Sequence, residues 1–344
     1  MLNRLARRLP NVLSVAALLL AGGAEAQFIP AENADADAMY AHFKKAQQIA
    51  GLDLYPHFAH ACIVDQHYRW TISRGIQQPG DIRPLQVMDN LYFIGQNAAS
   101  SWAIRTSEGL IVIDALNNGE EAEKYIVGGL RELGLDPAEI KYVVVTHAHG
   151  DHFGGANYLK DSFGARIAAS KVDWGVMEKM KTAPKEPPAA GRRRLPEAWA
   201  RLAPERDVEI EDGQAFRLGD TTLRFYITPG HTPGTLALIF ESTDRGEPHV
   251  AALYGSLGMP ASLEDKKTVL ASIDRFRKLA EEAGVDTLIA NHQTRDLALQ
   301  KLEILRLRRD GDPNPFVVGK QGYLRYMDIQ TECVYYAIAR EGQM

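Results

Sequence analysis

The chain has 344 residues, 45% of them hydrophobic, and a formal net charge of −5. This length and composition suffice for a full hydrophobic core, so we expect one large α/β domain with an extension instead of two equal domains. The acidic balance argues against a nucleic acid as substrate, because an enzyme that follows a phosphate backbone needs a basic face. The arginines at 192–194 are too few to reverse this balance, and we interpret them as part of a solvated loop.

Residues 1–26 have the features of an export signal peptide. Arginines at 4, 7 and 8 precede an apolar stretch at 12–21, and Ala24-Glu25-Ala26 places small residues where a signal peptidase cuts. The apolar stretch is short for a membrane span, so a retained anchor is the weaker alternative. We therefore expect a periplasmic or secreted protein with no stable membrane association after the leader is removed.

Residues 27–84 form an N-terminal extension. We expect a helix at 32–51, followed by an irregular stretch to residue 80 that carries His57, His60 and His67. These histidines could form an accessory metal site or line a cleft. Their spacing matches no single helix or strand face, which favours surface or packing roles.

Cys62 and Cys333 are the only cysteines of the chain. In an oxidising compartment they could form a disulfide that ties the extension to the C-terminal helix. The sequence does not show whether their Cα atoms come close enough, so a disulfide and two buried free thiols stay equally open.

The remaining residues, 85–344, alternate between strands and helices. A stretch rich in Pro, Ala and Arg at 182–207 interrupts them, either as an active-site lid or as a passive loop, with a short helix at 197–202. Strands followed by helices, twice over, predict two sheets packed face to face with helices outside, an αββα sandwich. The expected strands are 86–94, 101–106, 110–114, a run ending near 145, 208–211, 216–218, 222–227, 235–241 and 250–254, and the expected helices are 120–133, 154–163, 263–283, 295–309 and 320–341.

Four residues of the kinds that bind metals follow the buried run Val143-Val144-Val145. They are His147, His149, Asp151 and His152. Imidazoles at i and i+2 at a strand end can point the same way and bind one divalent ion, while the Asp-His pair turns toward a second ion. A polar turn with satisfied histidines is the alternative, but packed chains rarely concentrate such residues without metal.

Two further histidines stand at the ends of later strands. His231 lies in the loop Thr228-Pro229-Gly230-His231-Thr232-Pro233-Gly234, and His292 follows the apolar run at 288–290. Either histidine alone would more often be an ordinary polar residue beside a turn. Together with the motif at 147–152, we interpret both as metal ligands.

The run His147-Ala-His149-Gly-Asp151-His152 resembles the signature of the metallo-β-lactamase superfamily, and the loop around His231 resembles the Gly-His-Thr-Pro-Gly loop of that family. The resemblance covers residues 85–344 and implies the αββα fold. It also implies two zinc ions per chain. Three imidazoles at the first zinc leave one tetrahedral position open, which is typical of a catalytic zinc site. The first zinc would be bound by His147, His149 and His231, and the second by Asp151, His152 and His292.

Within the superfamily the chain is most similar to the third subclass of zinc β-lactamases. That subclass has the same ligand set, a serine where another subclass has a metal-binding cysteine, here Ser256, and a terminal helix with Glu-Cys, here Glu332-Cys333. Other hydrolases of the superfamily, such as glyoxalase II and lactonases, carry a metal-bridging aspartate at the position of Ser256. The chain departs from the subclass at Gly255, usually Asp, and at Gly258, usually a serine that contacts the substrate carboxylate.

The resemblance implies a dizinc hydrolase of small molecules, in which a metal-bridging hydroxide attacks a carbonyl, and the leader at residues 1–26 implies that it is exported. Asp151 would orient that hydroxide and relay its proton. We expect β-lactam amides as substrates. Gly258, Met259 and the 182–207 insertion favour the alternative of a more apolar cleft for a lactone or another cyclic amide or ester. A metal-binding protein without turnover is the weakest hypothesis, and the sequence leaves the oligomeric state open.

Overall fold

The computed structural model describes residues 34–68, 72, 74–182, 197–255 and 258–344. The predicted signal peptide, the arginines at 192–194, most of the 182–207 insertion and Ser256 lie outside these residues. Within the described part of the chain, no helix combines the length and the apolar character that a bilayer crossing requires.

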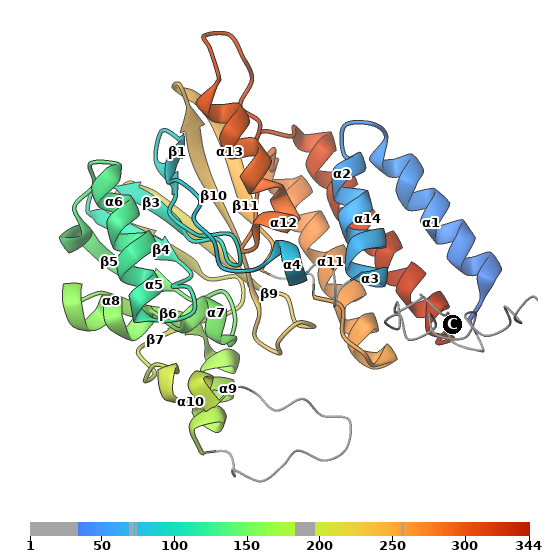
Figure 1. Cartoon of the computed structure of the whole chain (residues 1–344), viewed down its shortest axis with the longest axis horizontal. Helices are drawn as coiled ribbons and strands as arrows, with labels where there is room; N and C mark the ends of the chain where they lie inside the picture. Colours follow the sequence, from blue (N-terminus) through green and yellow to red (C-terminus); the bar gives the residue numbers. More distant parts are fainter. Residues whose placement is uncertain (1–33, 69–71, 73, 183–196, 256–257) are drawn as a thin grey trace, which may run out of the picture.

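Two β-sheets pack face to face, and helices cover the outer face of each (Figure 1). In the first sheet the strands follow sequence order; β1 to β4 pair antiparallel, and β4 to β7 pair parallel. The strands of this sheet are β1 (Leu85–Met88), β2 (Leu91–Phe93), β3 (Trp102–Thr106), β4 (Gly109–Ile113), β5 (Ile140–Val144), β6 (Arg166–Ser170) and β7 (Val208–Ile210).

The second sheet has the order β12-β11-β10-β9-β8. Its neighbouring strands are antiparallel except for β11 and β12, which are parallel. The strands are β8 (Ala215–Leu218), β9 (Thr221–Ile227), β10 (Leu236–Asp244), β11 (Glu247–Leu253) and β12 (Thr287–Ile289).

Successive side chains of β4 pack into two different apolar clusters. Leu110 and Val112 join the cluster beneath the helices of the first sheet, whereas Ile111 and Ile113 join the cluster between the two sheets. A strand buried on both faces reads as a continuous apolar run, because successive side chains point to opposite faces. The predicted αββα sandwich is confirmed.

Helices complete the outer layers. Those on the first sheet are α5 (Gly119–Glu121), η3 (Ala122–Val127), α6 (Gly128–Glu132), η4 (Pro137–Glu139), α7 (Gly150–Phe153), α8 (Ala156–Phe163), α9 (Lys171–Thr182) and α10 (Glu197–Leu202). The second sheet is covered by α11 (Leu263–Ala283) and α14 (Lys320–Arg340), while α12 (Gln293–Asp296) and α13 (Ala298–Arg306) follow β12.

Three local expectations were wrong, and two further elements were not anticipated. The single strand expected at 86–94 is a hairpin, because Asp89 and Asn90 form a turn between β1 and β2. The helix expected at 295–309 is broken at Leu297, whose φ of 61° lies in the left-handed region. β6 and α9 were not expected, and the stretch to residue 80, expected to be irregular, is largely helical where it is described. It comprises α2 (Tyr55–Phe58), η1 (Ala59–Val64), α3 (Asp65–His67) and α4 (Arg74–Ile76).

The extension packs along the C-terminal helix, where Figure 1 shows the blue helix α1 (Ala36–Ala50) beside the red helix α14. Asp35 caps α1 by accepting a hydrogen bond from Ala38 N at 2.9 Å. A disulfide joins Cys62 of η1 to Cys333 of α14, with 4.9 Å between their Cα atoms. Tertiary packing of this kind stabilises short helices that their own sequence would not predict.

The three histidines of the extension lie among packing contacts. His57 is buried, and its Nδ1 donates to Arg295 O over 3.0 Å. Nε2 of His67 lies 2.6 Å from the hydroxyl of Tyr336, and Nδ1 of His60 lies 3.6 Å from Asp65 Oδ2. Within the described residues, none of the three belongs to a group that could hold a metal.

Candidate metal centre

The site lies where parallel strands β4 and β5 end. Since the two strands are parallel neighbours, their carboxyl ends lie side by side, and Asp114 after β4 comes next to Thr146 after β5. Asp114 has a φ of 62° and accepts hydrogen bonds from Thr146 N at 2.7 Å and Thr146 Oγ1 at 2.8 Å. Aspartate is among the few residues that tolerate this backbone conformation.

The structure brings the six predicted ligand residues together in two groups of three. In each group the nitrogen and oxygen donor atoms lie within 4.8 Å of one another. The first group is His147, His149 and His231, and the second group is Asp151, His152 and His292.

In the first group the three imidazole rings stand edge to face. Their centroids are 4.6 to 4.8 Å apart, and His231 Nε2 lies 3.0 Å from His149 Nδ1. His147 is fully buried, whereas His149 and His231 retain partial exposure. The group is therefore open to solvent on one side.

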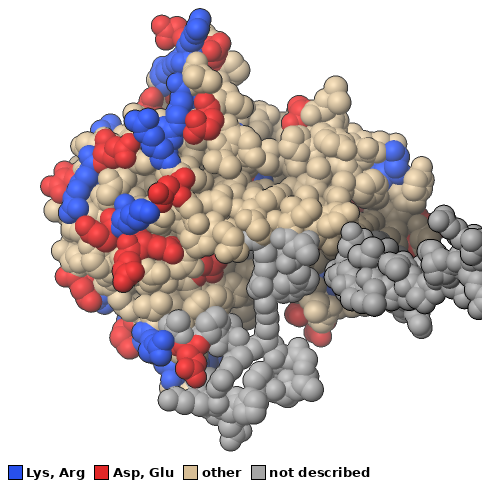
Figure 2. Space-filling view, viewed as in Figure 1, with Lys and Arg blue, Asp and Glu red and all other residues tan. Residues whose placement is uncertain are grey.

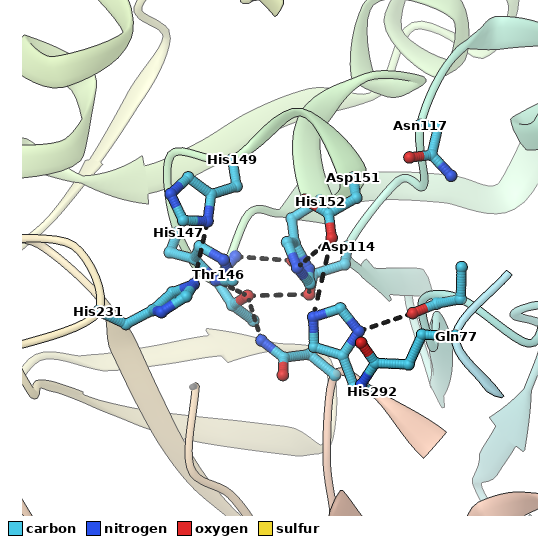
Figure 3. Close-up of polar contacts among 12 residues, drawn as sticks. Gln77, Asp114, Asn117, Thr146, His147, His149, Asp151, His152, His231 and His292 are labelled. Atoms are coloured by element: carbon cyan, nitrogen blue, oxygen red, sulfur yellow. Dashed lines mark hydrogen bonds and ion pairs between the residues drawn. The ribbon is translucent and has the colours of Figure 1, made fainter. Parts of the chain in front are cut away.

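In the second group, Asp151 Oδ2 lies 3.4 Å from His152 Nε2 and 3.7 Å from His292 Nε2. The ring centroids of His147 and His152 are only 4.0 Å apart, so the two groups adjoin. Figure 3 shows this arrangement, with His231 beneath His149 and His292 beneath Asp151.

Hydrogen bonds fix the orientation of these rings. His152 Nδ1 lies 2.7 Å from Asp114 Oδ2, and His292 Nδ1 donates to Ala98 O over 2.7 Å. Thr146 Oγ1 lies 3.2 Å from His147 Nδ1 and donates its own proton to Asp114. Partners of this kind select the tautomer and leave the opposite nitrogen free to bind a metal.

The donor set fits divalent zinc. Nε2 of His147 and Nε2 of His152 are buried without any hydrogen-bond partner among the described residues, which is costly unless their lone pairs bind a metal or accept a hydrogen bond. Burial, and then the neighbouring imidazoles, hold the pKa of His147 well below its ordinary value. Burial also lowers the pKa of His149 to about 4. Both rings are therefore neutral near pH 7, as metal ligands must be.

Charge in the second group is distributed differently. Burial opposes ionisation of Asp151, but the imidazoles of His152, His292 and His149 hold the pKa of its carboxyl well below the ordinary value. Burial also disfavours a charged His152, but the carboxylates of Asp151 and Asp114 raise its pKa to about 10. A cation bound there would displace a proton from His152.

Asp173, which the sequence did not single out, ties together the loops of the first group. It is buried at the start of α9 and accepts hydrogen bonds from Ala148 N and Gly234 N, each at 2.8 Å. It also accepts from Thr232 Oγ1 at 2.6 Å. Burial raises the pKa of Asp173, although these hydrogen bonds favour its ionised form. An isolated acid in a helix gives no sequence signal of such a role.

Gly258 and Met259 do not line the site equally. Gly258 lies against His231, so that a Cβ at this position would overlap the imidazole at Nδ1 and Cε1. Met259 is partly buried against the apolar cluster beneath α11. The backbone at residue 258 therefore borders the first group, and it leaves no room for a side chain in this arrangement.

Trp199 of α10 covers the other edge of the first group. Its indole lies 5.1 Å from the His149 ring, between centroids, and occupies the space where a side chain of Gly150 would be. The described end of the 182–207 insertion thus reaches the site, although residues 183–196 are outside the described part.

Comparisons with known proteins agree with this geometry. The family model of the metallo-β-lactamase superfamily matches residues 94–244. A metallo-β-lactamase motif mutant from Cronobacter sakazakii is 31% identical, with a TM-score of 0.58, over 72% of this chain and 93% of that chain. The chain belongs to the metallo-β-lactamase superfamily. The predicted membership is therefore confirmed.

Two further similar proteins differ in their described activity. A subclass B3 metallo-β-lactamase of Bradyrhizobium japonicum is 26% identical, with a TM-score of 0.57, over 78% of this chain and 93% of that chain. A hydroxyacylglutathione hydrolase of Acidiphilium cryptum is 30% identical over 51% of this chain. That match spans 65% of the A. cryptum enzyme, slightly less than two thirds of its length.

Gly258→Ser is expected to remove metal from the first group instead of adding β-lactamase activity. The new Cβ would push the His231 imidazole aside, so we expect total bound zinc to fall toward one ion per chain. Elemental analysis after dialysis would measure this. Gly175→Ser on α9 is the matched control, because a Cβ there meets nothing within 4 Å. Full zinc content with increased penicillin turnover in Gly258→Ser would contradict the expectation.

Proposed function

We propose that this protein is a dizinc hydrolase that opens β-lactam amides. The observation that carries the proposal is the pair of adjoining ligand groups, one of three imidazoles and one of a carboxylate and two imidazoles. Zinc ions held there would activate a water molecule near neutral pH and polarise the substrate carbonyl. The resemblance in fold to a subclass B3 β-lactamase supports the choice of substrate.

The chain's own residues supply orientation and proton transfer. The Asp151 carboxylate is 29% exposed, so it can reach a water molecule and a substrate in the open side of the site. Because its pKa is low, it is ionised and can accept a hydrogen bond from the attacking water. Zinc would make that water acidic enough for its proton to pass to this weakly basic carboxylate. Hydrogen bonds to Asp114 and to Ala98 O hold the rings of His152 and His292, respectively, in their orientation.

A lactone, or another cyclic amide or ester, is the second candidate substrate. Gly258 favours it, because no side chain at that position can contact a substrate carboxylate while His231 keeps its place. The similarity to hydroxyacylglutathione hydrolases also favours an acyl substrate other than a β-lactam.

Nucleic acid is not part of the proposal. On the face shown in Figure 2, basic and acidic side chains are interspersed and form no continuous basic stripe. Binding along a phosphate backbone requires such a stripe.

We propose export to the periplasm or the medium. The features of residues 1–26 and the Cys62–Cys333 disulfide support it, because disulfides persist in oxidising compartments.

One substrate panel tests the proposal. Zinc-loaded protein would be assayed with a chromogenic cephalosporin, a penicillin, a carbapenem and a series of lactones, and His149→Ala would serve as the control. We expect β-lactam turnover above the control, with kcat/KM values exceeding those for the lactones. Lactone turnover with β-lactams at the control level would establish the second candidate instead.

A further inference from the structure

Hydrogen bonds within the hydrolase domain hold the loop that carries His292. Asp296 is buried and accepts hydrogen bonds from Ala290 N at 2.7 Å and Ala298 N at 2.9 Å, on either side of His292. Trp102 Nε1 donates to Ala290 O over 2.8 Å. Leu297 adopts a left-handed conformation that a residue with a side chain holds only when its surroundings impose it.

The extension holds the same loop from the opposite side. Asp65 Oδ2 lies 2.5 Å from Nη1 of Arg295, three residues after His292, and both side chains are mostly buried. His57, also from the extension, donates to the backbone oxygen of Arg295. Arg295 N in turn donates to His292 O over 2.9 Å, which closes the first turn of α12.

The extension is itself anchored on α14 beside this contact. Cys62, which precedes Asp65 by three residues, forms the disulfide with Cys333, and buried apolar side chains surround this bond. Figure 1 shows α2 and α3 of the extension next to α14 and close to α12. The disulfide therefore connects α14 to the segment that carries Asp65, and the ion pair connects Asp65 to Arg295 in the loop of His292.

We propose that the extension positions the second metal group, with the Asp65–Arg295 ion pair holding His292 and the Cys62–Cys333 disulfide holding Asp65. Neither residue of the ion pair touches the reacting atoms, so both are positioning residues. The inference rests on the proposed dizinc function. It assigns residues 55–67 a role in metal binding that the six ligand residues do not reveal.

Asp65→Asn tests the ion pair, because it keeps the shape of the side chain and removes its charge. We expect wild type to release two zinc ions in separate steps to a chromophoric chelator. The variant should lose the second-group zinc at roughly tenfold lower chelator concentration, which is the size of effect that follows removal of a hydrogen-bond partner of a metal ligand. The chelator concentration that removes the first-group zinc should not change. Turnover lost at limiting zinc should return in excess zinc, and amides of α12 should exchange hydrogen faster.

Asp53→Asn is the matched control. Asp53 belongs to the same extension and pairs with Arg325 of α14 at 2.7 Å, away from the loop of His292. It should leave both zinc steps unchanged. The double variant Cys62→Ser/Cys333→Ser should shift the second step in the same direction as Asp65→Asn. If Asp65→Asn loses helical circular dichroism, Asp65→Asn/Arg295→Gln, which removes both charges, takes its place with the same expected result.

Two results would overturn the inference alone. One is a second zinc step that is identical in wild type, Asp65→Asn and the disulfide-free variant. The other is loss of both zinc ions together with helical circular dichroism in every variant, which would make the extension merely structural. Release of a single zinc ion by fully active wild type would instead overturn the proposed function, and this inference with it.

Discussion

Asp151→Asn is expected to lower kcat by a factor of about 10²–10⁴, the usual contribution of a general acid or base, while the first metal group keeps its zinc. The substitution removes the only carboxylate of the second group, which both attracts the cation and takes the proton from water. The remaining imidazoles of His152 and His292 would bind zinc weakly. Metal content and kcat measured on the same preparation would check both parts.

Asp161→Asn serves as the control for that experiment. Asp161 is an exposed acid on α8 that belongs to neither ligand group, and its replacement should change neither metal content nor kcat. Full activity of Asp151→Asn with a single zinc would contradict the dizinc proposal, and iron in place of zinc in wild type would contradict it too.

His231→Ala is expected to empty the first group and to abolish nearly all turnover. It removes one of three imidazoles, and the two that remain, His147 and His149, cannot complete a zinc site. Total zinc should fall to about one ion per chain or less, and the residual ion should lie in the second group. Elemental analysis after dialysis, followed by a hydrolysis assay at saturating substrate, measures both effects.

His249→Ala is the matched control for His231→Ala. His249 is a partly exposed histidine on β11 whose Nδ1 lies 2.8 Å from Asp286 Oδ2, outside both ligand groups. Its loss should leave zinc and turnover unchanged. A His231→Ala protein that retains two zinc ions and its activity would show that the first group is assigned wrongly.

The sequence predicted the fold and the ligand loops because their signals are local. Apolar runs ending in closely spaced histidines mark strand ends, and the superfamily membership and the αββα sandwich that followed from them are confirmed. The roles of the six ligand residues stay predictions, although the structure gathers them into two groups.

The supporting residues could not be predicted from such patterns. Asp114 and Asp173 act through contacts between segments far apart in the chain, and a single acid at a strand end or in a helix is common without any such role. Gly258 was interpreted as a missing hydroxyl, whereas its contact with His231 depends on how two distant loops meet. Short helices of the extension lack a periodicity of their own, since packing on α14 forms them.

The disulfide also changes the covalent topology of the molecule. Cys62 and Cys333 are 271 positions apart in sequence, and all six ligand residues lie between them. In the oxidised chain, residues 62–333 therefore form one large covalent ring that contains every ligand residue. A single backbone cut within the ring would leave the two fragments joined by the disulfide. Ligand residues on opposite sides of the cut would therefore lose their covalent connection only after a reductant cleaves that disulfide.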